Sequence, residues 1–390
     1  MNILEKVDNA KIVVCCGSGG VGKTTISATI GLYGALSGRK TLVLTIDPAR
    51  RLADSLGLKA FDFEEQPVPE DKFKGIDKQE GGELYAMMLD TSRVFDRIIM
   101  KYASSEEIKE KIFQNRYYKH LSKTLAGTHE YMAMEKLYEI YEENNYDLIV
   151  LDTPPSRRAL DFLEAPERLN NLLSKHFFWK VIKPYFVAGR MGLKMFSFLA
   201  SPILRAISKI LGTQALQDLT DFFRLADDAF VDGFRQREDS IRKVLASSES
   251  IFLAITSPMR APLLEALFLY DRLKAFQMPF GGFIINRVHP ILSEINQSEK
   301  DKLNKNKIYQ LDNLFDDISE IDIDLKNKLI QNYHNFIRLG QSDDQTIKKM
   351  MTITESKIPI HTIDFFENDV YDFSGLLKIK SYLEKERINA

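Results

Sequence analysis

The stretch KIVVCCGSGGVGKTT, residues 11–25, decides the fold of this 390-residue chain. Residues 11–16 form a short, apolar, β-branched run, which predicts a buried strand. The small and apolar residues 24–36 predict a helix packed closely on a sheet. Between the two, Gly17 to Thr24 satisfies the pattern G-x-x-x-x-G-K-[ST]. Its glycines let backbone N–H groups turn around phosphate oxygens, and the N-terminus of the following helix adds its dipole.

This phosphate loop assigns chemistry to individual side chains. Lys23 reaches the β- and γ-phosphates, and the Thr24 hydroxyl is a ligand for Mg²⁺. The alternative, a glycine-rich turn with an incidental lysine, is disfavoured because a strand precedes the loop and a helix follows it. We therefore expect nucleotide binding here, with Lys23 also catalytic. The predicted binding residues are Gly17, Ser18, Gly19, Gly20, Val21, Gly22, Lys23, Thr24 and Thr25.

Working outward, the chain alternates strands with helices. Further buried strands are predicted at residues 40–46, 83–89, 146–151, 250–256, 282–285 and 357–363. Helices are predicted at 51–58 and across 92–145 with a break at 127–128, and an exposed loop at 61–82. This alternation predicts an α/β fold with a doubly wound, mostly parallel sheet.

Composition narrows the class of protein. The net charge of −2 excludes a globally basic coat for nucleic acid, and 28% charged with 44% hydrophobic residues is ordinary for a folded domain. Cys15 and Cys16 are adjacent, so they cannot join distant segments or form a spaced zinc set. Together with a polar, charged start, these features predict a cytoplasmic protein that binds no nucleic acid.

Two acidic residues follow predicted strands. Asp47 begins the segment DPARR, and Asp152 begins DTPP. Because ligands of open α/β sheets gather at the carboxyl ends of the strands, both acids are expected near the phosphates. Asp152 would hold Mg²⁺ directly or through water, and Asp47 would orient or deprotonate the attacking water as well as contact the metal. For either residue alone, the alternative is an N-cap of the next helix.

Two insertions depart from a minimal α/β domain. We expect a nucleotide-binding core at 1–166 and 246–390, with a polar helical insertion at about 299–349. Residues 92–145 and 167–245 would form a helical subdomain that serves as a lid for a client. From 168 to 217 there are eight basic residues and no acidic one. The longest charge-free run, 195–204, is about half the length of a membrane span.

The second part of this subdomain carries an apolar stripe at helical spacing. Its members are Phe196, Leu199, Ile203, Ile207 and Leu211. Three alternatives remain open for residues 177–211: packing on the sheet and on neighbouring helices, a mobile groove for a hydrophobic client, or contact with an anionic membrane surface.

The motifs together resemble the ArsA/Get3 family of ATPases, in its bacterial anion-transporting branch. The similarity rests on VVCCGSGGVGKTT, LVLTIDPARRLADSLGL, ELYAMMLD, LIVLDTPPSRRALDFL and FIINRV, in this order along most of the chain. The resemblance implies a P-loop NTPase fold of the class that includes the signal-recognition-particle GTPases and MinD, with ATP and Mg²⁺ as cofactors. It also implies a dimeric switch that ATP closes and hydrolysis reopens.

The resemblance further implies roles for single residues. Asp47 would be the switch I acid that positions water, and Asn286 would recognise the adenine, unless it only forms a local turn. Switch II would begin with Asp152, Thr153, Pro154 and Pro155.

The departures from the family are informative. The signature lysine that reaches the partner's nucleotide is replaced by Ser18. The missing positive charge would have to come from Arg50, Arg51, Arg157 or Arg158, and the sequence does not choose among them. The cysteines of the arsenite site and the C-x-x-C zinc clasp are also missing from the sequence, which disfavours arsenite export and a zinc-bridged dimer.

We therefore expect a Mg²⁺-dependent ATPase, a homodimer or a heterodimer with a paralogue, that captures and releases a hydrophobic protein client. Two alternatives stay open: the energy-coupling subunit of an anion transporter, and a small-molecule kinase or ligase on the same fold. A role in division-site patterning is weakened by Ser18 and by the large insertions.

Overall fold

A computed structural model describes residues 3–46, 51–58, 63–103, 105–114, 128–153, 228–291, 323–354, 358–367, 369–370 and 372–385. Its centre is an eight-stranded sheet in the order β3-β4-β2-β5-β1-β6-β7-β8. The strands are β1 (Ile12–Gly17), β2 (Lys40–Thr45), β3 (Gln66–Pro67), β4 (Glu83–Met88), β5 (Leu148–Asp152), β6 (Ser250–Thr256), β7 (Phe280–Val288) and β8 (Ile360–Asp364). Every pairing is parallel except that of β3 with β4. The mostly parallel sheet expected from the sequence is confirmed.

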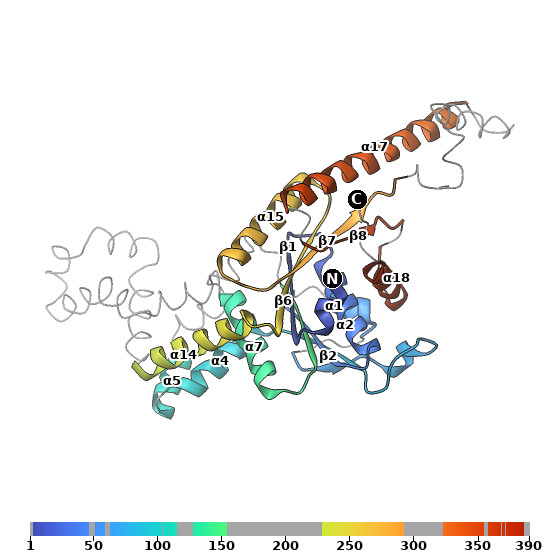
Figure 1. Ribbon diagram of the computed structural model, residues 1–390. Helices are drawn as coiled ribbons and strands as arrows, with labels where there is room; N and C mark the ends of the chain where they lie inside the picture. The colour runs from blue at the N-terminus through green and yellow to red at the C-terminus, as the bar shows by residue number, and fades with distance from the viewer. Residues whose placement is uncertain are drawn as a thin grey trace, which may run out of the picture.

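Helices cover both faces of the sheet (Figure 1). One face is covered by α1 (Ile3–Asp8), α2 (Lys23–Leu36), α3 (Arg51–Leu56) and α18 (Phe373–Glu384). The other is covered by α4 (Thr91–Tyr102), α5 (Glu106–Gln114), α7 (Thr128–Glu143), α14 (Asp228–Leu245), α15 (Arg260–Ala275) and α17 (Ile323–Ile353). Side chains of β1 alternate between the two cores, with Val13 in the first and Val14 in the second. Burial on both faces explains why these strands are continuous apolar runs.

Helix α2 lies very close to the sheet, as its small residues predicted. A Cβ atom added at Gly34 would come 2.5 Å from Cδ2 of Leu148 and 2.7 Å from Oγ1 of Thr41. Any larger residue would push α2 away from β2 and β5. This close packing fixes the position of the loop from which α2 starts.

The polar insertion predicted at 299–349 contains, in its described part, most of the 31-residue helix α17. Its carboxyl-terminal half is anchored in the core by Ile347 and Met350. Asp343 accepts hydrogen bonds from the backbone N–H of His289, at 3.0 Å, and is 2.8 Å from its ring Nδ1. The amino-terminal end reaches beyond the sheet (Figure 1), where Leu325 and Leu329 are exposed.

The expectation of an exposed loop at 61–82 is wrong in part. Strand β3 pairs antiparallel with the edge strand β4, and a 3₁₀ helix, η1 (Glu70–Phe73), follows it. Val68 and Phe73 are buried against the α2 face of the sheet. A two-residue strand containing Pro67 carries no alternating pattern, and it sits at the sheet edge where proline is tolerated.

Other expected boundaries shift by a few residues. Strand β7 extends well beyond the expected 282–285, and the helical stretch 92–145 is also broken after Tyr102. Within the described residues, none of the helices combines the length and apolar character needed to cross a membrane. The proposed lid residues 177–211 and their apolar stripe lie outside the described residues.

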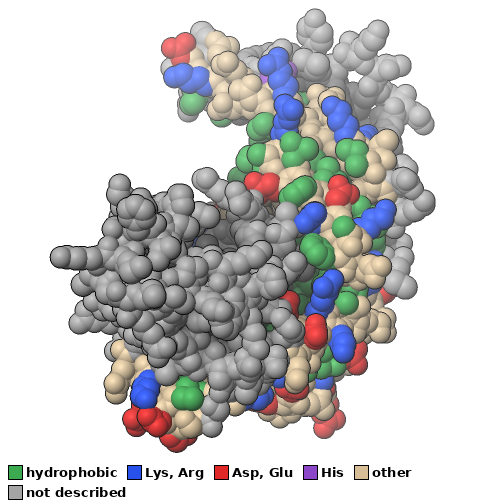
Figure 2. Space-filling model, turned by 90° about the vertical axis from the view of Figure 1, so that its left-hand side faces the viewer, with side chains coloured by type: hydrophobic (Ala, Val, Ile, Leu, Met, Phe, Trp, Pro, Cys, Tyr) green, Lys and Arg blue, Asp and Glu red, His purple; other side chains and the backbone are tan. Residues whose placement is uncertain are grey.

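The surface next to α15 mixes hydrophobic and charged side chains. On the face shown in Figure 2, hydrophobic groups lie among Lys, Arg, Asp and Glu residues in the described part. Leu264 and Phe268 of α15 and Met259, which precedes its first residue, are large hydrophobic residues that are exposed.

Candidate nucleotide site

The phosphate loop connects β1 to α2 at the carboxyl edge of the sheet. Gly20 and Gly22 adopt left-handed conformations with φ of 79° and 95°, which other residues adopt at a cost. Gly22 is the N-cap of α2 and has no side chain to cap the first N–H groups of that helix. These donors are therefore available to an anion at the helix N-terminus, where the helix dipole also favours negative charge.

Lys23 is held inside this loop. Its side chain is only 6% exposed, and Nζ donates a hydrogen bond of 2.8 Å to the carbonyl oxygen of Ser18. The Ser18 hydroxyl in turn donates to the carboxylate of Glu265 on α15. Gly19 and Gly20 are exposed beside them. The ammonium of Lys23 thus lies under an open loop of backbone groups, as phosphate binding requires.

Asp152 joins three strands at one point. In the parallel registers it pairs with Cys15 of β1 on one side and with Thr45 of β2 on the other. Its side chain is fully buried, and Oδ2 accepts hydrogen bonds from Thr24 Oγ1 at 2.7 Å and Thr45 Oγ1 at 2.9 Å. The structure therefore brings together the two residues, Thr24 and Asp152, that the sequence predicted separately as Mg²⁺ ligands.

The donor set around Asp152 fits Mg²⁺. This cation prefers oxygen ligands, and in nucleotide sites it is usually bound by one or two carboxylates together with phosphate and water. A buried carboxylate beside a threonine hydroxyl supplies such oxygens. Thr45 was not predicted from the sequence. The only signal for it is its position at the end of a buried strand that neighbours β5.

Thr153, the second predicted switch residue, is tied to the strand of the phosphate loop. Its hydroxyl donates a 2.8 Å hydrogen bond to the carbonyl oxygen of Cys15, and its N–H donates to the same oxygen at 3.3 Å. The start of the predicted switch II therefore contacts the residue two positions before Gly17.

Asn286 links the far side of the sheet to the phosphate loop. Its side chain is 8% exposed, and Nδ2 donates a 2.9 Å hydrogen bond to the carbonyl oxygen of Val21. Its Oδ1 accepts from the N–H of Arg287, which has a left-handed φ of 64°. A Cβ atom at Gly22 would collide with this amide. Recognition of adenine by Asn286 stays a prediction. Its hydrogen bond to the phosphate loop is seen in the structure.

Thr25, the last predicted residue of the loop, is half-buried in the first turn of α2, and its carbonyl accepts from Thr29 Oγ1. Six other predicted residues lie outside the described part of the chain. They are Asp47, Pro154 and Pro155 and the arginines at 50, 157 and 158. Their roles in water positioning, switching and charge compensation stay predictions.

Cys15 and Cys16 lie in β1 directly before the loop and are free thiols. Burial raises the pKa of the Cys16 thiol to about 12, against the opposing effect of the Lys23 charge. Burial also raises the pKa of Cys15. Thiols with such pKa values are protonated and unreactive at neutral pH, so these residues act as core side chains.

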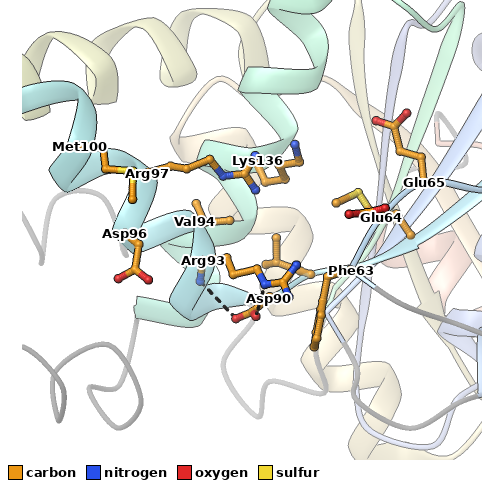
Figure 3. Close-up of a pocket in the computed structure, with 12 residues that line it drawn as sticks. Phe63, Glu64, Glu65, Asp90, Arg93, Val94, Asp96, Arg97, Met100 and Lys136 are labelled. Carbon is orange, nitrogen blue, oxygen red and sulfur yellow. Dashed lines mark hydrogen bonds and ion pairs between the residues drawn. The ribbon is translucent and has the colours of Figure 1, made fainter. Parts of the chain in front are cut away.

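A cavity of about 640 Å³ opens beside the carboxyl end of β4. Figure 3 shows Phe63, Arg93 and Asp90 on one side of it and Arg97 and Lys136 on another. Arg93 pairs with Asp90 at 3.3 Å and lies over the Phe63 ring, whereas Arg97 and Lys136 share Glu139 at 2.9 and 3.1 Å. Sequence reasoning missed this cavity because its walls come from three separate segments.

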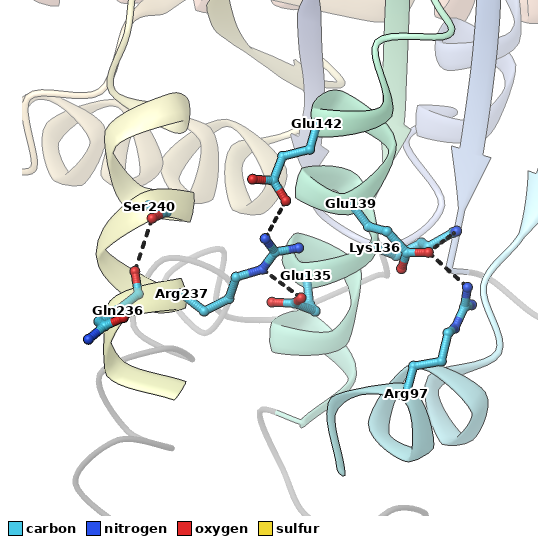
Figure 4. A network of polar contacts seen from close by, with 8 residues as sticks. All are labelled: Arg97, Glu135, Lys136, Glu139, Glu142, Gln236, Arg237 and Ser240. Carbon is cyan, nitrogen blue, oxygen red and sulfur yellow. Dashed lines mark hydrogen bonds and ion pairs between the residues drawn. The ribbon is translucent and has the colours of Figure 1, made fainter. Parts of the chain in front are cut away.

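The same helical layer contains a buried ion-pair network (Figure 4). Arg237 of α14 donates from Nε to Glu135 at 2.7 Å and from Nη1 to Glu142 at 2.5 Å, both on α7. Its guanidinium lies 4.1 Å from the centre of the Tyr138 ring. Burial raises the pKa of Glu135 even though Arg237 opposes this shift. The network fixes α14 on the helix that leads into β5 and Asp152.

Comparison with known proteins places the chain among ATPases. A family model described as anion-transporting ATPase matches residues 10–342. The putative arsenical pump-driving ATPase 2 of Aquifex aeolicus is 25% identical over 325 residues, covering 81% of this chain and 93% of that protein. The ATPase ASNA1 homolog of Entamoeba dispar is 24% identical over 82% of this chain and 90% of its own. The ATPase GET3 of Malassezia globosa is 27% identical over 47% of this chain and 51% of its own.

Proposed function

This chain belongs to the ArsA family of ATPases, and we propose that it uses Mg²⁺-dependent ATP hydrolysis to drive a dimeric switch that captures and releases a hydrophobic protein client. The family resemblance seen in the sequence is confirmed by the match over residues 10–342. ATP hydrolysis is the activity of the family. The metal, the residue roles, the dimer and the client belong to the proposal.

The observation that carries the site assignment is the meeting of Lys23, Thr24 and Asp152 at the carboxyl edge of β1 and β5. In the proposed reaction, Lys23 turns from the Ser18 carbonyl to the β- and γ-phosphates. Thr24 and Asp152 would hold Mg²⁺, which when bound would neutralise charge that develops on the phosphate oxygens. The N–H groups of the loop and of the first turn of α2 orient the phosphates.

Substitution of Asp152 tests this assignment. We expect Asp152→Asn to abolish Mg²⁺-stimulated phosphate release, because a neutral amide binds a hard dication poorly. Asp147→Asn is the matched control, since Asp147 precedes the opposite end of the same strand, where it accepts from the Lys40 N–H at 2.9 Å. Calorimetry with ATP and Mg²⁺ would accompany the assay. Wild-type protein that takes up no adenine nucleotide, or full activity of Asp152→Asn, would contradict the proposal.

The client is proposed from the names of relatives and from the sequence of residues 177–211. Relatives are named ATPase GET3 and ATPase ASNA1 homolog, and the stretch 177–211 is basic and rich in aromatic residues. Deletion of 177–211 should abolish retention of an apolar peptide while nucleotide affinity persists. Loss of both activities would show that the two are not separate modules.

A second candidate function follows from other relatives. The family model is described as anion-transporting, and one relative is named a putative arsenical pump-driving ATPase. An energy-coupling subunit would be purified from membranes together with a membrane partner, whereas a client-binding switch would not require one. A kinase or ligase would instead transfer phosphate to a metabolite, so a product other than ADP and free phosphate would identify it.

A further inference from the structure

A side chain of helix α15 contacts the phosphate loop. The Ser18 hydroxyl donates a hydrogen bond to Oε2 of Glu265, although Glu265 lies on the exposed side of α15. α15 follows β6, which pairs with β1 along its whole length to Gly17. The contact therefore joins the loop to an element 247 residues later in the chain.

The Ser18 residue is held at two of its atoms. Its hydroxyl is fixed by Glu265, and its carbonyl oxygen accepts the 2.8 Å hydrogen bond from Lys23 Nζ. Ser18 is 9% exposed and Lys23 is 6% exposed. The bond between them is buried, and the bond from Ser18 to Glu265 is partly buried. The orientation of the Ser18 residue thus determines where the ammonium of Lys23 rests.

From these contacts we infer that Glu265 is a positioning residue for nucleotide binding, which acts through Ser18 to hold the phosphate loop in the conformation that receives the phosphates. The inference rests on the proposed nucleotide site. It assigns to α15 a role that the loop motif does not contain, because G-x-x-x-x-G-K-[ST] accepts any residue at the position of Ser18.

The geometry of Glu265 and its charge have opposite effects on nucleotide binding. The Glu265 carboxylate orders the loop, but its negative charge lies next to a site for anionic phosphates. Glutamine keeps an oxygen that accepts the Ser18 hydrogen bond and removes the charge. Alanine removes both. Comparing the two substitutions therefore separates the ordering of the loop from the repulsion of the phosphates.

The test is a double-mutant cycle read by calorimetry with ADP and with ATP in the presence of Mg²⁺. We expect Ser18→Ala and Glu265→Ala each to weaken nucleotide binding by about 5- to 10-fold, the loss of one partly exposed hydrogen bond. The variant carrying both changes should bind nucleotide no more weakly than either single variant, because each change removes the same hydrogen bond. Asp271→Ala, an exposed acid further along α15, is the control and should bind as wild type does.

Glu265→Gln supplies the second readout. Its affinity for ADP should lie within about twofold of the wild-type value. The substitution should favour ATP binding at least as much as ADP binding, because the repulsion that it removes grows with phosphate charge. Additive effects in the cycle, unchanged affinity in Glu265→Ala, or failure of Glu265→Gln to restore binding would overturn the inference. If wild-type protein bound no nucleotide, the proposed function itself would fail, and this inference with it.

Discussion

At the scale of single residues, the candidate site depends on groups that are buried and already hydrogen-bonded. Asp152 is fully buried and accepts from two threonine hydroxyls, and Lys23 donates to a loop carbonyl. A buried charge of this kind is costly unless it is compensated. Its position at the carboxyl edge of the sheet supports the proposed role of Asp152 in binding.

Lys23→Ala should weaken ATP binding by about 10- to 100-fold, because hydrogen bonds to charged groups contribute roughly 1.5–3 kcal/mol each. Calorimetry with Mg²⁺ and ATP would measure the change. Lys40→Ala is the control, since this partly exposed lysine begins β2 at the opposite edge of the sheet. Unchanged affinity in Lys23→Ala would show that the loop is not the phosphate site.

The residues of the site could be predicted to different extents. Lys23, Thr24 and Asp152 belong to short local motifs, so their proximity was predictable from the rule that strand ends gather ligands. Thr45 and Glu265 carry no such signal, because a threonine at a strand end and a glutamate on an exposed helix face are common. Only the three-dimensional packing brings them to Asp152 and Ser18.

At the scale of elements, strands that are buried on both faces were predicted well. β6 matches its expected bounds. β1 is shifted by one residue, and β2 and β4 each end one residue earlier than expected. The short strand β3 and the helix η1 were missed because their stability comes from edge pairing and from burial of Val68 and Phe73, not from a periodic pattern.

The Arg237 network provides an element-scale prediction. Arg237→Ala should lower the free energy of unfolding by about 3–5 kcal/mol, because it leaves the buried Glu135 uncompensated. Arg237→Met combined with Glu135→Leu should be much less destabilising, since it removes both buried charges. Urea unfolding would measure each variant. Arg242→Ala is the control, since Arg242 is an exposed arginine on the same helix. An equal loss of unfolding free energy in Arg242→Ala would contradict a special role for the network.

The N-cap of α18 should make that helix sensitive to acid. Asp372 accepts a 2.9 Å hydrogen bond from the Gly375 N–H, and this bond lowers the pKa of its carboxyl group. A lowered pKa means that the stabilisation is present above the ordinary value of 3.8 and is lost as the pH falls through the folded-state value. Asp372→Ala should cost about 0.5–2 kcal/mol at pH 7.

Asn is the matched replacement at this N-cap. Asp372→Asn keeps the acceptor but does not titrate, so its stability relative to wild type should rise as the pH is lowered from 5 to 3. Thermal unfolding at a series of pH values would record the difference. A constant difference between the two proteins across this range would show that the Asp372 charge does not contribute to the cap.

At the scale of the whole molecule, the strand order places β5 between β1 and β2. Asp152 therefore lies between the phosphate loop and the segment that follows Thr45, where Asp47 comes two residues later. The fold could be predicted at this scale, because alternating strands and helices permit few arrangements. The domain boundaries and the lid stay predictions, since residues 154–227 lie outside the described part of the chain.

The dimeric switch is tested at this scale by Asp47→Asn. The variant should bind ATP but not hydrolyse it, because the amide cannot activate water, and should accumulate as a closed dimer. Light scattering after size-exclusion chromatography, with and without ATP, would measure the mass. The Lys23→Ala protein is the matched control and should show no shift in mass with ATP. Hydrolysis at the wild-type rate by Asp47→Asn would contradict the switch I role.

The hydrogen bond from Asn286 to the Val21 carbonyl joins residues 265 positions apart. During translation at roughly 5–20 residues per second, the loop leaves the ribosome about 15 to 50 seconds before the amide that clamps it. A nascent chain thus carries an unclamped loop for most of its synthesis. Firm retention of nucleotide would then mark a polypeptide in which β7 has already joined the sheet.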